Sequence, residues 1–365
     1  MIKLQNVIEI IESFAPLAFQ EKYDNSGLLV GNKQQEITGI LICIDVTLPV
    51  IEEAIEQNCN LIVSHHPIIF TGLKKLIGQT EVERCVAKAI KNDIALYAAH
   101  TNLDNANDGV SFRMAQKIGL QNTLVLVPKT DLLSKLVTFV PINCIDKVQN
   151  AMFKAGAGNI GNYDCCSFSH IGKGTFRASD KCHPFCGNIG ELHTEDEMRL
   201  EVIFPKYLTS KIVKELLEVH PYEEPAFDII PLENKWAQVG SGIVGNLHSP
   251  MNESDFLALL KEKFQVSSIK HSKLLNRPIF KVAVCGGSGG DFISNAKYAD
   301  ADIFVTADIT YHRFSEAENS IIIADIGHFE SEQYTKEIIL EQLIKKIPNF
   351  AIRLSAHDGH SVFYS

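Results

Sequence analysis

The sequence predicts an α/β protein with two domains, one of which is built from both chain ends and interrupted by the other. Near both ends of the 365-residue chain, apolar strand-like runs alternate with helix-like segments, which is typical of a largely parallel sheet covered by helices in a three-layer arrangement. Between them, the order β-α-β-β-α-β is typical of a ferredoxin-like unit. We therefore expect an α/β domain at 1–127 and 236–365 and an inserted ferredoxin-like domain at 128–235.

The first part of the chain is expected to alternate strands and helices. Short continuous apolar runs predict buried strands, whereas apolar positions repeating every three to four residues predict helices. The predicted strands are Ile37–Ile44, Asn60–Ser64 and Ile94–Ala99, and the predicted helices are Leu48–Gln57, Thr80–Lys91 and Asp108–Gly119. The last helix should end at Gly119, because glycine readily adopts the left-handed conformation that closes many helices.

The character of the sequence changes near Val127–Lys129. The elements predicted after this point are a strand at Leu133–Val140, a helix at Ile145–Ala155, strands at Cys165–Thr175 and Arg199–Phe204, a helix at Leu208–Val219 and a strand at Ala226–Pro231. Together they span about 100 residues, which is enough for an independent domain.

After residue 235 the alternation of the first part returns. The predicted elements are a helix at Glu253–Phe264, strands at Phe280–Cys285, Ile303–Thr306 and Ile321–Asp325, a helix at Tyr334–Lys346 and a strand at Phe350–Leu354. The chain is therefore expected to leave one α/β domain, form the insert and re-enter the first domain.

Composition excludes some classes of protein. Hydrophobic residues make up 45% and charged residues 21%, and no apolar run approaches the ~20 residues that cross a bilayer. The N-terminal MIKLQNVIEIIESFAP predicts an amphipathic helix and not a signal peptide, so we expect a cytoplasmic protein. A net charge of −10 argues against non-specific nucleic-acid binding, although it leaves room for a local basic patch.

The nine cysteines are an odd number and several lie in apolar runs, so we expect reduced thiols. Cys182 and Cys186 are the pair that could be interpreted differently, as ligands of a structural zinc ion. Such a site needs about four soft ligands, and no second matching pair stands nearby. We therefore expect two ordinary thiols on a loop.

Three segments carry residues suited to metal chemistry, and the first is Ser64-His65-His66-Pro67. It follows a predicted buried strand, and ligands of open α/β sheets bind at the carboxyl ends of strands. Neighbouring side chains of an extended segment diverge, so each imidazole could meet a different ion, or one could bind while the other orients. The alternative is a pair of satisfied loop histidines.

The other two segments also follow predicted strands. In His100-Thr101-Asn102-Leu103-Asp104, Asp104 is a hard ligand and His100 could be a ligand, an acid–base group or an orienting group; Asp104 could instead cap a turn. His328 and Glu332 are four residues apart, so on a helix they would share a face. The alternative for them is an ordinary surface pair.

The three segments together predict a centre with two metal ions. Each ends a strand of what we interpret as one sheet, and the three imidazoles and two carboxylates suit Zn²⁺, Mn²⁺, Fe²⁺, Co²⁺ or Ni²⁺ more than Ca²⁺. Five ligands exceed the need of one tetrahedral ion and suit two ions about 3.5–4 Å apart. Glu332 is the expected bridge, because a carboxylate has two oxygens and an imidazole binds through one nitrogen at a time.

Other polar segments give weaker signals. Gly286–Gly290 (GGSGG) is expected to form a tight turn near the site that could touch a substrate anion. Asp308 and His312 follow a strand and are candidates for substrate or ligand contact. Asp24 and Asn25 could reach the site or form a turn. The segment His357–His360 is expected to be solvated, and we assign it no role.

At this point the motifs resemble a known family. YDNSGLLVG at 23–31, SHHPIIF at 64–70, HTNLD at 100–104, HPYEEPAFDI at 220–229, CGGSGG at 285–290 and ADIGHFESE at 324–332 are similar to the NGG-one-interacting-factor-three-like family. Its bacterial members are often labelled GTP cyclohydrolase type 2 homologs. The resemblance covers essentially the whole chain; Cys182, Cys186 and the C-terminal AHDGHSVFYS depart from the family pattern.

The resemblance implies a ligand set and an assembly. It implies that His65 and His66 ligate two divalent metals together with Asp104, His328 and a bridging Glu332. It further implies a toroidal homohexamer, a trimer of dimers, whose metal sites face an internal cavity, and it likens the insert at 128–235 to PII-signalling and CutA-like domains.

The family label implies GTP ring opening by metal-activated water, with His100 or His312 as proton shuttles. A centre with two metals suits many hydrolytic substrates, phosphoesters included, so we expect a metal-dependent hydrolase without fixing its substrate. The alternative is a non-catalytic hexamer that binds metal, a small effector or a macromolecular partner. The acidic balance of the chain counts against nucleic acid as that partner.

Overall fold

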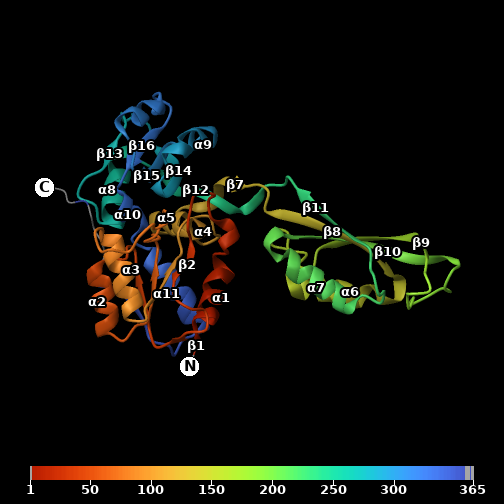
Figure 1. Cartoon of the computed structure of the whole chain (residues 1–365). Helices are drawn as coiled ribbons and strands as arrows, with labels where there is room; N and C mark the ends of the chain where they lie inside the picture. Colours follow the sequence, from red (N-terminus) through yellow and green to blue (C-terminus); the bar gives the residue numbers. More distant parts are fainter. Residues whose placement is uncertain (1, 358–361, 363–365) are drawn as a thin grey trace. The chain divides into compact units, whose positions relative to one another are not determined.

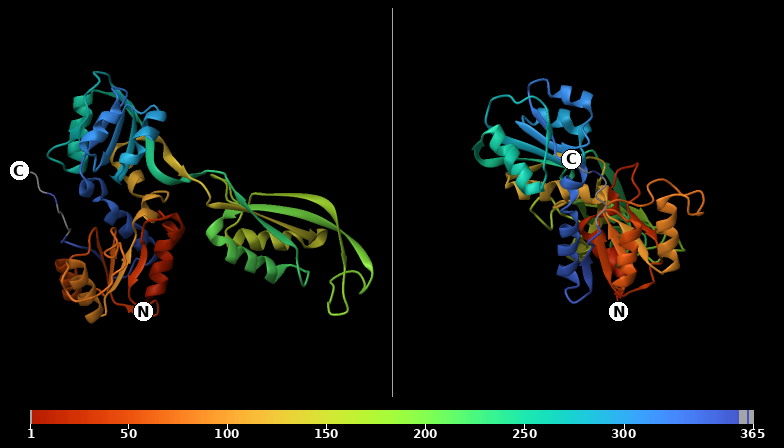
Figure 2. Two further views of the ribbon diagram at one scale, coloured as in Figure 1. Left: turned by 45° about the horizontal axis from the view of Figure 1, so that its top comes forward. Right: turned by 90° about the vertical axis from the view of Figure 1, so that its left-hand side faces the viewer.

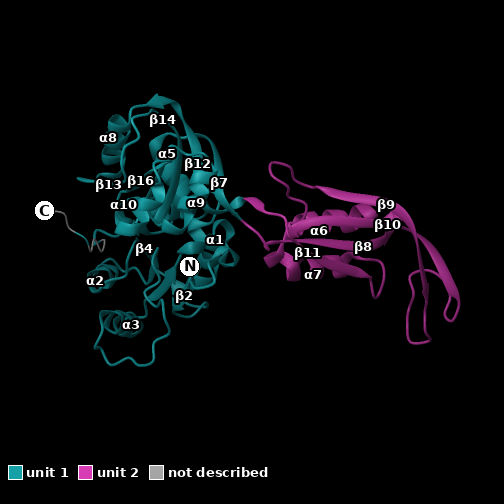
Figure 3. Cartoon of the chain, turned by 90° about the horizontal axis from the view of Figure 1, so that it is seen from above, with its two compact units in different colours: residues 1–128, 238–365 teal, residues 129–237 magenta. Residues whose placement is uncertain are grey.

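The structure is a computed structural model that describes residues 2–357 and 362 (Figure 1). The chain divides into two compact units, which are coloured separately in Figure 3 and described here one at a time. Unit 1 comprises 1–128 and 238–365, and unit 2 comprises 129–237. None of the described helices is both long and apolar enough to span a membrane.

Unit 1 contains a five-stranded sheet that is coloured red to orange in Figure 2, apart from its blue C-terminal strand. Its strands are, in spatial order, β17 (Ile352–Leu354), β4 (Ile40–Cys43), β5 (Leu61–Ser64), β6 (Ala95–Ala98) and β2 (Gly27–Val30). The first four are parallel and β2 runs antiparallel to β6. Two further short strands, β1 (Ile2–Lys3) and β3 (Glu36–Ile37), pair with each other in an antiparallel arrangement.

Helices cover the five-stranded sheet because its central strands are apolar on both faces. Leu41 and Ile62 pack with the buried side chains of α2 (Leu48–Glu56) and α3 (Glu81–Lys91). Successive strand residues point to opposite faces, so the buried Ile40 and Ile42 face away from these helices. Helix α1 (Leu4–Phe14) contacts α11 (Thr335–Lys346), and α11 contacts β4 and β17.

A second, six-stranded sheet of unit 1 is coloured teal to blue in Figure 2, apart from β7. Its strands are, in spatial order, β13 (Lys270–His271), β16 (Ile322–Asp325), β15 (Ile303–Ala307), β14 (Ile279–Ser288), β12 (Trp236–Met251) and β7 (Gln121–Lys129). Strands β14, β15 and β16 are parallel, whereas β12 and β13 run antiparallel to their neighbours β14 and β16.

The six-stranded sheet also has an apolar cluster on each face. On one face, Val282 and Val305 pack with buried side chains of α5 (Val110–Ile118) and α8 (Glu253–Phe264). On the other, Ala283 and Phe304 pack with Ile293 and Ala296, which belong to α9 (Ile293–Tyr298), and with Ala317 of η5 (Tyr311–Ala317). The remaining short helices of the unit are η1 (Leu17–Phe19), α4 (Thr101–Asp104), η4 (Gly290–Phe292) and α10 (His328–Glu332).

Unit 2 is a four-stranded antiparallel sheet with two helices. In chain order its elements are β8 (Leu133–Pro141), η2 (Ile142–Cys144), α6 (Ile145–Ala155), β9 (Ser167–Arg177), β10 (Leu192–Pro205), η3 (Lys206–Leu208), α7 (Thr209–Val219) and β11 (Phe227–Leu232). The spatial order is β11-β8-β10-β9. Leu200, Val202 and Phe204 of β10 pack with α6 and α7, so the alternate residues of β10 lie on the opposite face of the sheet.

The structure corrects three expectations. Unit 1 has two large sheets and not one, because local alternation does not say which strands pair. The glycine-rich segment is not a tight turn over its whole length: β14 continues as far as Ser288, and only then does η4 begin. Strand β10 begins at Leu192, well before the expected Arg199, since its first part is polar and lacks the apolar run on which the prediction depended.

Candidate metal centre

The residue pair His65–His66 leaves the end of β5, and the two rings are held differently. His65 is fully buried, and its Nδ1 lies 2.8 Å from the carbonyl oxygen of Ala99. A carbonyl can only accept, so Nδ1 must carry a proton, and in the neutral ring the lone pair of His65 is on Nε2. That Nε2 is buried without a hydrogen-bond partner, which is the state of an imidazole prepared to bind a metal.

His66 makes hydrogen bonds through both ring nitrogens. Its Nδ1 lies 2.8 Å from Oδ1 of Asp45, and its Nε2 lies 3.0 Å from Oε2 of Glu332. Asp45 lies two residues after the end of β4, the neighbour of β5 in the sheet, and sequence reasoning missed it. The sequence signal that could have identified Asp45 is its place at the carboxyl end of a parallel strand, which is also the reason why His65 and His66 were chosen as candidates.

Asp104 ends the single helical turn α4, which follows β6. The turn is anchored by Asn102, whose side chain donates to the carbonyl oxygen of Ala15 and accepts from the backbone N–H of His100. Oδ1 of Asp104 is buried without a hydrogen-bond partner and lies 3.7 Å from Nε2 of His65. Two such atoms facing each other are costly unless a third group, such as a cation, comes between them.

His328 and Glu332 lie on α10, which follows β16 of the other sheet. Nδ1 of His328 lies 2.7 Å from Oδ2 of Asp308, so the sequence candidate Asp308 contacts a predicted ligand. Glu332 is buried, and its Oε2 lies 3.1 Å from Nε2 of His328 and 3.6 Å from Nε2 of His65. The five predicted ligands thus come from both sheets of unit 1 and lie together.

The donor atoms form two groups that share one carboxylate. His65, Asp104 and Glu332 form one group, and His66, His328 and Glu332 form the other, with all donor atoms of each group within 4.8 Å of one another. Imidazole and carboxylate donors suit divalent transition metals. The unpartnered Nε2 of His65 and Oδ1 of Asp104 fit a bound cation, so the residues could hold metal in either group.

Burial and charge oppose each other in this cluster. Burial favours neutral imidazoles, but hydrogen bonds to Asp45 and Glu332 outweigh it and raise the pKa of His66 to about 10. For the same reason Glu332 and Asp308 raise the pKa of His328 to about 9. Burial would raise the pKa of Glu332, yet the surrounding imidazoles hold it well below its ordinary value. The cluster without metal is therefore an ion-paired network.

His100 lies against both histidines of the pair. Its ring centroid is 5.3 Å from that of His65 and 5.5 Å from that of His66. Its Nδ1 lies 2.7 Å from Oδ1 of Asp24, and the other oxygen of Asp24 accepts from Thr101. Burial would raise the pKa of Asp24, but these hydrogen bonds keep it well below its ordinary value. The ionised Asp24 thus orients the His100 ring.

The remaining predicted residues divide between the site and the surface. His312 is exposed on η5, where its ring contacts Tyr311; among the described contacts, none joins it to the five predicted ligands. Asn25 donates to the carbonyl oxygen of Ile69. Gly287, in contrast, lies against Glu332. Of the C-terminal segment, residues 358–361 lie outside the described residues.

A cavity of about 340 Å³ opens beside His66 and His328. Asp45 and Asp308 also line it, and so does Lys270, whose ammonium group is paired with Asp325 at 2.7 Å. On the side of His100 lies an exposed aromatic pair, Tyr23 and Phe70, with ring centroids 6.5 Å apart. Phe70 is 6.4 Å from the His100 ring.

Fold and site define a class of protein: a mixed α/β protein with clustered histidines and carboxylates that could hold metal ions. The model of the Duf34/NIF3 (NGG1p interacting factor 3) family matches residues 2–359, and the chain belongs to this family. This finding confirms the family resemblance seen in the sequence.

Relatives and solved structures agree with the family. A Bacillus subtilis (strain 168) protein named GTP cyclohydrolase 1 type 2 homolog is 39% identical over 341 residues, which covers 93% of this chain and 91% of that protein. A Halalkalibacterium halodurans protein of the same name is 40% identical over 343 residues, covering 93% and 92%. The crystal structure of a Bacillus cereus protein related to NIF3 superposes with a TM-score of 0.88 at 36% identity, covering 100% of this chain and 99% of that one.

Proposed function

We propose that this protein binds two divalent metal ions and acts as a metal-dependent hydrolase. One observation carries the proposal: the buried carboxylate of Glu332 lies among three imidazole Nε2 atoms, at 3.0 Å from His66, 3.1 Å from His328 and 3.6 Å from His65. A carboxylate shared between two ligand groups is the arrangement expected of a bridge between two ions. When bound, such ions supply Lewis acidity and activate water for attack.

The residues around the ligands have separate proposed roles. Asp45 and Asp308 accept hydrogen bonds from His66 and His328 and so fix which ring nitrogen faces the metal. His100 touches both histidines of the pair without being one of the five ligands, and Asp24 orients its ring. We therefore prefer His100 to the exposed His312 as the group that moves a proton to or from the substrate.

The surroundings of the site favour a compact substrate with a planar ring. The exposed Tyr23 and Phe70 beside His100 offer faces on which a nucleobase could stack. The cavity of about 340 Å³ is at the small end of ligand pockets, which span roughly 300–1,000 Å³. Beside the two predicted ligand histidines, its described lining offers one lysine, Lys270, and no arginine, so recognition of a triphosphate would depend on the metal ions. Ring opening of GTP, which the relatives' name suggests, is thus one candidate within the hydrolase class.

We also propose the assembly that the family resemblance implies, a toroidal homohexamer in which unit 2 serves as a ferredoxin-like insert. The β-α-β-β-α-β order of unit 2 and its antiparallel strand order support the second part. Light scattering of the purified protein tests the first part. A monomer or dimer at micromolar concentration would contradict it.

The experiment that tests the function measures metal content per chain in the purified protein and in His65→Ala and Glu332→Ala variants. We expect about two divalent ions in the unaltered chain and a sharp fall in both variants. Hydrolysis would then be screened with GTP first and phosphoesters next, with chelator as the control. Metal that is retained without chelator-sensitive turnover would favour the non-catalytic binding protein, and no metal uptake at all would overturn the centre itself.

A further inference from the structure

A second cluster of metal-binding side chains lies in unit 2, far in sequence from the first. It consists of Cys186, on the loop between β9 and β10, and of His193 and Glu195 on β10. The thiol, an imidazole nitrogen and a carboxylate oxygen of these residues lie within 4.8 Å of one another. His193 and Glu195 are two apart on a strand, so both point to the face of the sheet opposite α6 and α7.

The loop that carries Cys186 is fixed in place over this face. Gly187, next to the cysteine, has a positive φ of 76°, and a Cβ at this position would lie 2.7 Å from Cγ of the His193 ring. Only glycine allows the loop to approach the imidazole so closely. The backbone N–H of Gly190 donates to Ala178, and that of His183 donates to the Glu223 carboxylate, so both limbs of the loop are tied down.

The three side chains already contact one another. Nε2 of His193 lies 2.8 Å from Oε2 of Glu195. The Cys186 thiol lies within 4.8 Å of the donor atoms of His193 and Glu195. Tyr222 donates to Oε1 of Glu197 at 2.7 Å. The cluster is half-buried, so a small ion could reach it from solvent.

We propose that Cys186, His193 and Glu195 bind a divalent transition metal ion of the zinc class, separately from the centre at Glu332. A thiolate, an imidazole and a carboxylate are all ligands that Zn²⁺ takes, at roughly 2.0–2.3 Å each. Donor atoms of a tetrahedral site with such bonds are roughly 3.3–3.8 Å apart, so small side-chain rotations suffice to close the cluster on an ion. Loss of the thiol proton and of the His193–Glu195 hydrogen bond would accompany binding.

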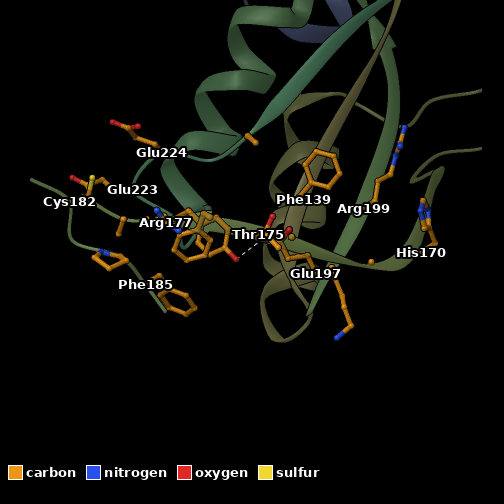
Figure 4. A pocket seen from close by; sticks show the side chains of 18 residues that line it. Phe139, His170, Thr175, Arg177, Cys182, Phe185, Glu197, Arg199, Glu223 and Glu224 are labelled. Carbon is orange, nitrogen blue, oxygen red and sulfur yellow. Dashed lines mark hydrogen bonds between the residues drawn. The ribbon is translucent and has the colours of Figure 1, made fainter. Parts of the chain in front are cut away.

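Three protein ligands leave one position of a tetrahedral ion for water or another small ligand. The cluster adjoins a cavity of about 590 Å³ on the same face of the sheet, through Phe185, which directly precedes Cys186 in the sequence and lines the cavity (Figure 4). Gly172 and Gly174 of β9 line this cavity, and a side chain at Gly174 would collide with Glu197, since its Cβ would lie 2.1 Å from Oε2 of that carboxylate. The metal therefore takes its fourth ligand from solvent or from a small molecule in this cavity.

Cobalt substitution tests this site in the full-length chain. Co²⁺ is added to the reduced, metal-free protein, and the near-ultraviolet absorption of thiolate-to-cobalt charge transfer is recorded. The five predicted ligands of the first centre are nitrogen and oxygen donors, so this absorption reports a cysteine ligand alone. We expect the band in the unaltered protein, its loss in Cys186→Ser and its disappearance when Zn²⁺ displaces Co²⁺.

Two serine variants are matched controls. Cys182→Ser changes the other cysteine of the same loop. Cys285→Ser changes a buried thiol whose pKa is raised by burial and by the charges of Asp104 and Glu332. Both are expected to keep the band. His193→Gln should weaken Co²⁺ binding by more than about tenfold. Loss of a group that only hydrogen-bonds to a metal ligand already weakens binding by about tenfold or more, and loss of a ligand itself should weaken it further.

No band in the unaltered protein, or a band that survives in Cys186→Ser, would overturn the proposal. Circular dichroism shows whether Cys186→Ser is folded; if it is not, the affinities of His193→Gln and Glu195→Gln for Co²⁺ decide. These results are independent of the hydrolase proposal, because the full chain with Glu332→Ala should lose the first centre and keep the thiolate band.

Discussion

Oε2 of Glu332 lies 3.0 Å from Nε2 of His66, although 266 positions separate the two residues in the sequence. His66 follows a strand of the five-stranded sheet, and Glu332 lies on the short helix after a strand of the six-stranded sheet. Their contact is therefore a point where the two sheets of unit 1 meet. A metal bound there would also hold the two halves of the unit together.

The shared carboxylate predicts an unequal effect of ligand substitutions. Asp104 belongs to one ligand group, His328 to the other, and Glu332 to both. Asp104→Asn and His328→Ala should therefore each leave about one ion per chain, and Glu332→Gln should leave almost none, against about two in the unaltered chain. Elemental analysis measures these values. Glu316→Gln, on the exposed η5, is the control and should keep both ions; full occupancy in Glu332→Gln would contradict the bridge.

The carboxylates behind the ligands should affect affinity more than stoichiometry. Asp45 and Asp308 each hold Nδ1 of a ligand histidine, at 2.8 Å and 2.7 Å. Replacing such a partner by asparagine is expected to weaken metal binding by about 10- to 100-fold. Competition with a chromophoric chelator measures the change. Asp291→Asn is a suitable control, since Asp291 is an exposed carboxylate paired with Arg313; equal losses in all three variants would show a general charge effect.

The metal-free protein should lose stability as the pH rises. The pKa of His66 is raised to about 10 and that of His328 to about 9, from an ordinary value of 6.5. Groups whose pKa is higher in the folded state stabilise it fully below the unfolded pKa and lose this effect as the pH rises through the folded pKa. With chelator present, the melting temperature is thus expected to fall between pH 6.5 and about pH 10.

A variant and an added metal separate this effect from general alkaline denaturation. Glu332→Gln removes the carboxylate that both imidazoles share, so its melting temperature should depend less on pH over the same range. Bound metal replaces the imidazole protons and should reverse the trend, because affinity rises as the ligands deprotonate. A melting temperature that is constant up to pH 10 in the metal-free, unaltered chain would show that the ion pairs do not contribute.

The sequence predicted which candidate ligands lie close together better than it predicted the sheets. His65, His66, Asp104 and His328 each follow a short apolar strand, and that position alone was enough to propose that they meet. The pairing of strands was not predictable in the same way. Local alternation cannot distinguish one parallel sheet from two sheets whose polar ends face each other, which is why a single sheet was expected.

What the sequence could not provide were partners brought by tertiary structure. Asp45 looked like any acidic residue after a strand until the fold placed it 2.8 Å from His66. His193 and Glu195 lie in a polar part of β10 that carried no apolar run, so Cys186 seemed to lack ligands nearby. Polar residues on an open sheet face give no periodic signal that distinguishes a site from a solvated surface.

The last prediction concerns Gly287, whose missing side chain makes room for Glu332. It has a positive φ of 63°, and a Cβ would lie 2.2 Å from Oε1 of Glu332. Its backbone N–H also donates to Ser331 at 2.9 Å, which fixes the segment against α10. Gly287→Ala is thus expected to cost about 1–3 kcal/mol of folding stability through backbone strain alone and, by displacing the carboxylate, to lower the metal content as well.

Thermal melting and elemental analysis measure these two effects of Gly287→Ala. Gly72→Ala is the control, because Gly72 is exposed, a Cβ there would meet nothing within 4 Å outside the adjoining residues, and the change should alter neither quantity. A Gly287→Ala protein that is destabilised yet keeps its full metal content would show that the glycine serves the backbone and not the position of Glu332.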